Sequence, residues 1–116
     1  MIKRNEERDR EVRERMRDGD GEVEIFHIFK KEELKGKARL LAHLTLRKNC
    51  SIGYHTHDNE EEVYYIVKGR GTVSEDGREY RVGPGDAVLT GGGAGHSIRN
   101  DEDEPLEVIA IILQYI

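Results

Sequence analysis

The stretch from Gly53 to Gly69 constrains this chain more than any other, because two histidines and a run of glutamates lead into a strand-forming segment. His55 and His57 are two residues apart, and side chains two apart in a strand point to the same face, about 6.6 Å from each other along the axis. Residues 62–68 are rich in β-branched and aromatic side chains, which favour a second strand. A hairpin of the two segments would bring Glu62 back beside the histidines. Because imidazole–metal bonds are about 2.1 Å long, the three side chains could then share one ion.

By itself this stretch has a second interpretation. Histidines two apart are also common on solvent-exposed strands, and the acidic run over residues 60–62 is typical of a charged turn. A metal site would need a further ligand from another part of the chain.

Residues 85–100 supply such a ligand. A turn at the start of this segment leads into a short apolar strand over residues 87–89, and the glycine-dense loop over residues 91–95 then leads to His96. Glycine adopts positive φ at little cost. We therefore expect this loop, and Gly93 above all, to take a fixed turned conformation that directs His96 inward. A flexible surface loop is the alternative.

Together the two segments resemble the two motifs of the cupin superfamily. The first motif has a glycine, five residues, His-x-His, three or four residues, a glutamate, six residues and a glycine. Its matches here are His55, His57, Glu62 and Gly69, with Asn49 in place of the opening glycine. The second motif is matched in register by Gly85, Gly93, His96 and Asn100, with Gly91 in place of its proline. The resemblance covers roughly residues 40–113.

This resemblance implies an all-β fold, the antiparallel jelly-roll β-barrel or double-stranded β-helix of cupins. It also implies one metal bound by His55, His57, Glu62 and His96. Glu60 and Glu61 are the alternatives to Glu62, but only Glu62 has the six-residue spacing to the closing glycine. These ligand types suit one divalent transition metal, Mn or Fe first, with Zn, Ni, Co and Cu as alternatives.

Cupins with this ligand set are often dioxygenases, decarboxylases, isomerases or lyases that act on small oxygen-rich molecules. The resemblance therefore implies a metalloenzyme with a small-molecule substrate, and a non-catalytic ligand-binding or sensor cupin is the alternative. Tyr64 should point to the same side as Glu62 and is a candidate to hydrogen-bond a substrate, unless it is a core tyrosine. Ser97 and Arg99 should face away from the metal, so the motifs contain no cation to clamp an anion.

Length and composition limit the protein further. A chain of 116 residues predicts one domain, here residues 1–36 as an N-terminal helix and arm strand and residues 37–116 as the barrel. The net charge of -5 argues against nucleic acid as a partner, because phosphate binding requires a basic excess. Since no apolar run approaches about 18 residues, we expect no membrane association. The absence of a signal-peptide pattern and the single Cys50, which cannot form an intramolecular disulfide, predict a cytoplasmic protein.

Local patterns predict the remaining elements. Residues 5–17 (Asn5 to Arg17) have opposite charges four apart, which favours a helix. Residues 22–29 and 39–46 alternate as strands, residues 32–36 favour a short helical turn, and Asp76-Gly77 predicts a tight hairpin.

The predicted strand over residues 39–46 places Leu40, Ala42, Leu44 and Leu46 on one face. Arg39 and His43 fall on the other face, which either lines the mouth of the barrel or carries His43 as a structural residue. The last strand, residues 106–116, is apolar on both faces, so we expect both to be buried. The barrel interior can cover only one of them, and we therefore expect a homodimer.

Overall fold

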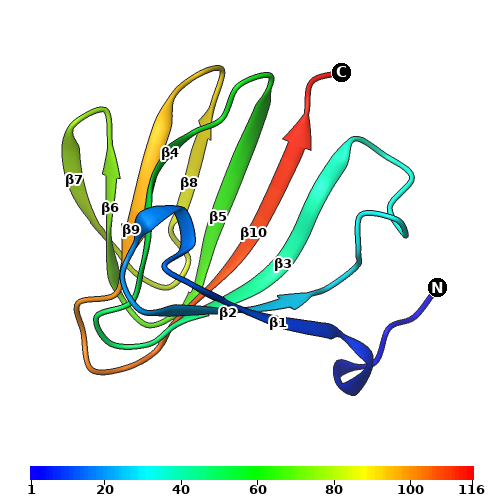
Figure 1. Cartoon of the computed structure of the whole chain (residues 1–116), viewed down its shortest axis with the longest axis horizontal. Helices are drawn as coiled ribbons and strands as arrows, with labels where there is room; N and C mark the ends of the chain where they lie inside the picture. The colour runs from blue at the N-terminus through cyan, green and yellow to red at the C-terminus, as the bar shows by residue number, and fades with distance from the viewer.

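The computed structural model describes all of residues 1–116 and confirms an all-β fold, in which two antiparallel sheets face each other as a jelly-roll barrel (Figure 1). The six-stranded sheet has the order β1 (Asp9–Glu14), β2 (Glu22–His27), β3 (Ala38–Leu46), β10 (Leu106–Gln114), β5 (Glu60–Lys68) and β8 (Ala87–Gly91). The four-stranded sheet has the order β4 (Ser51–Thr56), β9 (Gly95–Arg99), β6 (Gly71–Glu75) and β7 (Arg78–Val82). Only two short 3-10 turns, η1 (Asn5–Glu7) and η2 (Met16–Asp18), are helical, and neither is long or apolar enough to cross a membrane.

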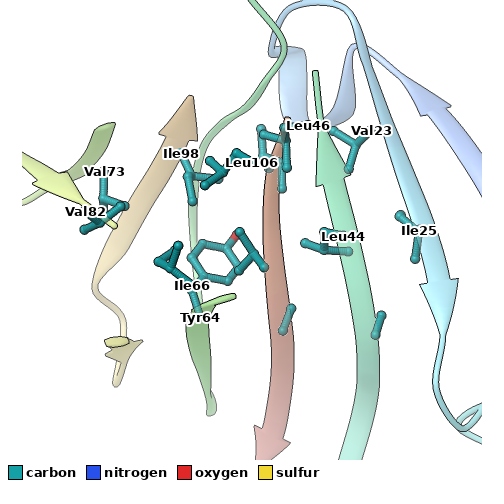
Figure 2. Packing of buried hydrophobic residues seen from close by; sticks show 14 residues of the cluster. Val23, Ile25, Leu44, Leu46, Tyr64, Ile66, Val73, Val82, Ile98 and Leu106 are labelled. Carbon is teal, nitrogen blue, oxygen red and sulfur yellow. The ribbon is translucent and has the colours of Figure 1, made fainter. Parts of the chain in front are cut away.

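The core lies between the two sheets and is built from alternate residues of their strands (Figure 2). As predicted, Ala42, Leu44 and Leu46 of β3 are buried and Leu40 packs against them. β10 contributes Leu106, Val108, Ala110 and Ile112, and the four-stranded sheet contributes Ile52, Val73 and Ile98. Each large apolar side chain that is fully removed from water stabilises the fold by about 1.5–3 kcal/mol, so this alternation holds the two sheets together.

The hairpin between β6 and β7 confirms the turn expected at Asp76-Gly77. Both residues have positive φ, 51° and 75°, as the two-residue turn with the twist of the flanking strands requires. The turn expected over residues 32–36 is a hydrogen-bonded turn near Leu34, whose amide donates to the carbonyls of Lys30 and Lys31.

The helix predicted over Asn5–Arg17 is wrong: the middle of this segment is the edge strand β1, which pairs with β2 along its whole length. Charges that would pair along a helix pair across the strands instead, as Arg10 Nε does with Glu24 Oε2 at 2.5 Å. Exposed pairs four apart stabilise a helix by only about 0.3–0.5 kcal/mol each. The segment also has almost no apolar stripe that a helix could pack against the barrel. The complete ladder of backbone hydrogen bonds to β2 therefore stabilises the strand more than the charge pairs would stabilise a helix.

The outer face of β10 is less buried than the sequence predicted. Ile109 and Ile111 are half-buried by neighbouring side chains, and Leu113 is 37% exposed. Tyr65, Val67 and Leu89 are also exposed on the outward side of the adjacent strands β5 and β8. In a single chain, an apolar surface therefore lies across the outside of the six-stranded sheet.

Asn100, which matches the last position of the second motif, fastens one end of the barrel. Its side chain is fully buried directly after β9. Its Nδ2 donates to the carbonyls of Leu46 and Glu104, both at 2.8 Å, and its Oδ1 accepts from the amide of Glu102, also at 2.8 Å. The side chain thus joins the end of β3 to the loop that leads into β10.

We predict that Asn100→Ala lowers the free energy of unfolding by about 2–4 kcal/mol, because three hydrogen bonds are lost and the buried carbonyl of Leu46 no longer receives one of them. Guanidinium chloride unfolding measures this change. Asn5→Ala is the matched control, since Asn5 is exposed and its side chain makes no hydrogen bond, and it should shift stability by less than about 0.5 kcal/mol. Equal stabilities for the two variants would contradict the fastening role.

Candidate metal centre

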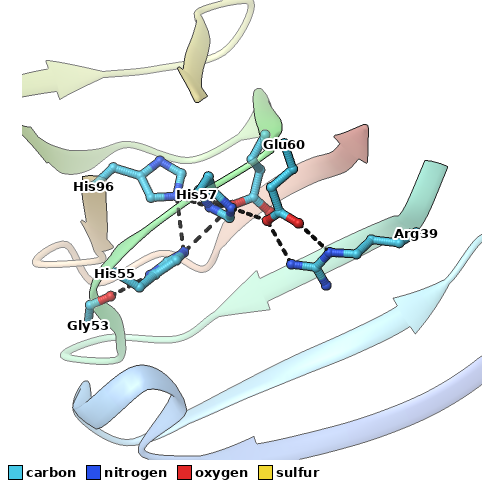
Figure 3. A network of polar contacts seen from close by, with 7 residues as sticks. Arg39, Gly53, His55, His57, Glu60 and His96 are labelled. Atoms are coloured by element: carbon cyan, nitrogen blue, oxygen red, sulfur yellow. Dashed lines mark hydrogen bonds and ion pairs between the residues drawn. The ribbon is translucent and has the colours of Figure 1, made fainter. Parts of the chain in front are cut away.

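The structure brings together all four side chains that the motifs identified. Figure 3 shows the three histidines among them pointing toward one another. Their ligand atoms lie within 4.8 Å of one another. His55 is in β4, His57 directly follows β4, Glu62 is in β5 and His96 is in β9. The site therefore joins the two sheets: β4 and β9 belong to one, and β5 belongs to the other. His57, Glu62 and His96 are buried, and the His55 side chain is 9% exposed.

The donor atoms are spaced as ligands of one ion would be. His96 Nε2 lies 3.1 Å from His57 Nε2, 3.2 Å from His55 Nε2 and 3.0 Å from Glu62 Oε1. Two ligands with bonds of about 2.1 Å at right angles are separated by about 3 Å. The four residues therefore fit a single metal ion without rearrangement.

Hydrogen bonds on the far side of two rings direct their other nitrogen inward. His55 Nδ1 donates to the carbonyl of Gly53 at 2.8 Å, and His57 Nδ1 donates to Glu60 Oε2 at 2.5 Å. In a neutral imidazole only one nitrogen carries the proton, so the Nε2 lone pair of each ring faces the cluster. His96 Nδ1 is buried without a hydrogen-bond partner.

Glu60 and Arg39 support this arrangement from behind, and neither role was predicted. Arg39 donates two hydrogen bonds to Glu60, from Nε at 2.7 Å and from Nη2 at 2.8 Å. Together with His57 it lowers the pKa of Glu60 to about 2, so this carboxylate stays charged behind the ring. Glu60 is thus confirmed not to be part of the four-residue cluster, but it holds one member in place.

The expectation that Arg39 shares a face with His43 is wrong because β3 contains a bulge. Leu40 pairs with Ile112 and Ala38 pairs with Leu113, so Arg39 is the extra residue and turns toward the cluster. Strand alternation alone predicts the opposite face, and no sequence signal marks this bulge. His43 keeps the outward direction and lies 3.0 Å from Glu107 Oε1, as the structural interpretation expected.

The electrostatics of the site favour a charged Glu62. Burial alone would raise the pKa of Glu62, but the three neighbouring imidazoles hold it well below its usual value. Glu62 in turn raises the pKa of His57, whereas burial lowers the pKa of His96. Tyr64 stacks on His96 with ring centroids 4.8 Å apart, and burial and the Glu62 carboxylate raise its pKa well above the usual value, so its phenol stays neutral.

The loop before His96 takes the turned conformation that was expected, and Gly93 has a φ of 93°. Its amide donates to the carbonyl of His57 at 2.8 Å, and the His57 amide donates to the carbonyl of Ala94 at 3.0 Å. The turn therefore connects the two histidine segments through their backbones. A side chain at Gly93 would force a left-handed conformation on a residue that disfavours it.

A cavity of about 160 Å³ opens beside the cluster toward β1, η2 and β3. Its apolar wall includes Leu40, Leu44 and Ile52, and Tyr64 reaches it from β5. Arg13, Arg17, Arg39 and His27 also line it. As predicted, the exposed Arg99 faces away from the site, and its Nη1 lies 3.5 Å from Asp20 Oδ2. The cations beside the cluster therefore come from outside the two motifs, two of them from the segment mistaken for a helix.

The comparisons with known proteins agree with this geometry. A family profile described as a cupin domain matches residues 42–112, the part of the chain that carries all four clustered residues. The chain belongs to the cupin family. It is 39% identical over 113 residues to a Thermotoga maritima protein named oxalate-binding protein, covering 97% of this chain and 93% of that protein.

Solved structures of other proteins show the same architecture. A Thermotoga maritima structure described as a predicted oxalate decarboxylase superposes with a TM-score of 0.93 at 38% identity, covering 98% of this chain and 99% of that chain. KdgF from Halomonas sp. superposes with a TM-score of 0.77 over 98% of this chain and 94% of that chain, but at 17% identity the likeness shows the fold alone.

Proposed function

We propose that His55, His57, Glu62 and His96 bind one divalent transition metal, and that this cupin uses it to bind and transform a small oxygen-rich anion. The observation that carries the proposal is the convergence of inward-facing imidazole nitrogens on a buried carboxylate. Lone pairs at such short separations repel one another unless a cation lies between them. A mixed nitrogen and oxygen donor set accommodates Mn or Fe first, and Zn, Ni, Co or Cu as alternatives.

When bound, the metal would act as a Lewis acid that polarises an oxygen ligand at an open coordination position. The chain's own residues supply the rest of the site. Glu60 and Arg39 keep the His57 ring in one tautomer and one orientation. The buried phenol of Tyr64 stacks on His96 and limits the movement of that ring. The apolar wall of the cavity reduces the access of water to the bound anion.

The names of the relatives support a small anion as the ligand, since one relative is named oxalate-binding and one structure is described as a predicted oxalate decarboxylase. A non-catalytic binding or sensor function is the second candidate, and one observation favours it. Glu62 is the only carboxylate that lines the cavity, and it belongs to the cluster. No second carboxylate therefore lies beside the ligand to act as a general acid or base. Incubation of the metal-loaded protein with oxalate, followed by assays for formate and carbon dioxide, distinguishes a decarboxylase from a binding protein.

We predict that a His55→Ala/His57→Ala double variant loses stoichiometric metal, because half of the donor set is removed. Metal content after purification without added metal, measured by mass spectrometry, checks this. His43→Ala is the matched control, because His43 faces the outside of the barrel. Full occupancy of the double variant would refute the assignment.

We also predict that the wild type releases metal as the pH falls from about 8 to about 5, since protons compete for imidazoles with an ordinary pKa of about 6.5. Metal occupancy that stays the same over this pH range would count against histidine ligands.

We predict that Glu60→Gln weakens metal binding by about 10–100-fold, the usual effect of removing a residue that orients a metal ligand. The negative charge that fixes the His57 tautomer is lost, while all four ligands remain. Competition with a metal chelator measures the dissociation constant. Glu61→Gln, one residue further on and with a side chain that makes no hydrogen bond, serves as the control and should leave the dissociation constant unchanged. Equal affinities in the two variants would rule out a supporting role for Glu60.

We propose further that the protein is a homodimer, and that the exposed apolar surface outside β10, β5 and β8 is where the second copy packs. Sedimentation at micromolar concentration should give twice the chain mass of 13.3 kDa. Leu113→Lys places a charge in the contact and should shift the protein toward the monomer. Ile2→Lys, at an exposed apolar residue outside the sheet, should not. A monomeric wild type would contradict the proposal.

A further inference from the structure

The cavity beside the cluster contains one cation whose charge is not balanced by the chain. Arg39 is paired with Glu60, as described above. Arg13 Nε lies 2.5 Å from Glu11 Oε1, and His27 Nε2 lies 2.7 Å from Glu11 Oε2, so these two residues share one carboxylate. Arg17 lines the same cavity and makes no side-chain hydrogen bond or ion pair.

Arg17 lines this cavity although much of the residue is exposed. Glu62 of the cluster lines it too, as does Tyr64, whose ring stacks on His96. Arg17 therefore lies at the wall of the cavity that opens beside the cluster. A positive side chain without a partner at the wall of a cavity is a recognition element for an anion.

The backbone around Arg17 is held in conformations that are costly for its residues. Arg15, Arg17 and Asp18 all have positive φ, at 50°, 53° and 63°. A non-glycine residue in this region costs on the order of 1 kcal/mol or more, and such residues concentrate at ligand-binding sites. The turn persists because the Arg15 amide donates to the carbonyl of Gly21 at 2.8 Å and the Gly19 amide donates to the carbonyl of Met16 at 2.9 Å.

Gly53 connects this turn to the cluster. A Cβ atom at Gly53 would lie 1.9 Å from the carbonyl oxygen of Arg17, so only glycine lets η2 lie this close to β4. The carbonyl of the same glycine accepts the hydrogen bond from His55 Nδ1. One residue thus orients a ring of the cluster and admits the backbone that carries Arg17.

We propose that the cavity binds a small dicarboxylate, with one carboxylate at the metal and the other at the guanidinium of Arg17, which selects dicarboxylates over monocarboxylates. This inference rests on the proposed metal-dependent function. A planar guanidinium forms two parallel hydrogen bonds with a carboxylate, a geometry that a spherical charge does not specify. A divalent metal, the Glu62 carboxylate and the Arg17 guanidinium together have a net formal charge of two positive units. This balances the two negative charges of a dicarboxylate. A monocarboxylate uses the metal alone and gains little from Arg17.

The test compares two ligands on two variants. Metal content is first measured for each protein, and the metal-loaded proteins are then titrated calorimetrically with oxalate and with acetate. Arg17→Gln should weaken oxalate binding by at least about tenfold, the effect of losing hydrogen bonds between charged groups, and acetate binding by no more than about twofold. Arg15→Gln, at a neighbouring arginine with the same left-handed backbone that does not line the cavity, should leave both affinities unchanged.

The outcomes separate this inference from the proposed function. If metal-loaded wild type binds neither ligand, the proposed function fails. If wild type binds oxalate and Arg17→Gln binds it equally well, the proposed function stands and the role of Arg17 is refuted. Equal proportional losses for oxalate and acetate would also refute it, because a merely structural role of Arg17 weakens both ligands alike. Selective loss of oxalate affinity supports the assignment.

Discussion

A carboxylate buried between two sheets is the constraint on which the rest of this structure depends. Glu62 is only 3% exposed, and a charged group in such a place is destabilising unless partners replace the water it has lost. Three imidazoles surround it, and they come from β4, from the residue beyond it and from β9. Because β5 and these segments lie in opposite sheets, the cluster forms only when the barrel is closed. The site is therefore complete only in the folded barrel.

Small departures from regular strand geometry aim the side chains of the site. A bulge in β3 turns Arg39 from the outer face to the inner side, where its guanidinium fixes Glu60 and, through it, His57. A second irregularity lies in β4 between Ile52 and His55. Each shifts the alternation of a strand by one residue, which is enough to reverse the face of a side chain. The positions of these residues thus follow from pairing with neighbouring strands.

The N-terminal segment changes the character of the site. As a helix it would have lain on the surface, but as β1 and η2 it forms one wall of the cavity and brings Arg13 and Arg17 beside the cluster. The two motifs provide the four candidate ligands and no free cation, so the arginines that line the cavity come from outside them. In this cupin the barrel strands assemble the four candidate ligands, and β1 and η2 add positively charged side chains beside them.

The sequence by itself determined the fold class, the four clustered residues, the hairpin at Asp76-Gly77 and the turn at Gly93. The fold class and the four residues follow from the resemblance of the two motifs to those of cupins, and the two turns follow from residues that adopt left-handed conformations. Only the tertiary structure decided that residues 9–14 form an edge strand, because weak local helix pairs compete there with a backbone ladder to β2. It alone placed Arg39 behind His57 and Arg17 beside the cavity, since both depend on how closely neighbouring strands and turns approach. Local sequence patterns carry no information on how closely two strands or turns approach each other. Those approaches place the charged side chains, Arg39 and Arg17, beside the cluster.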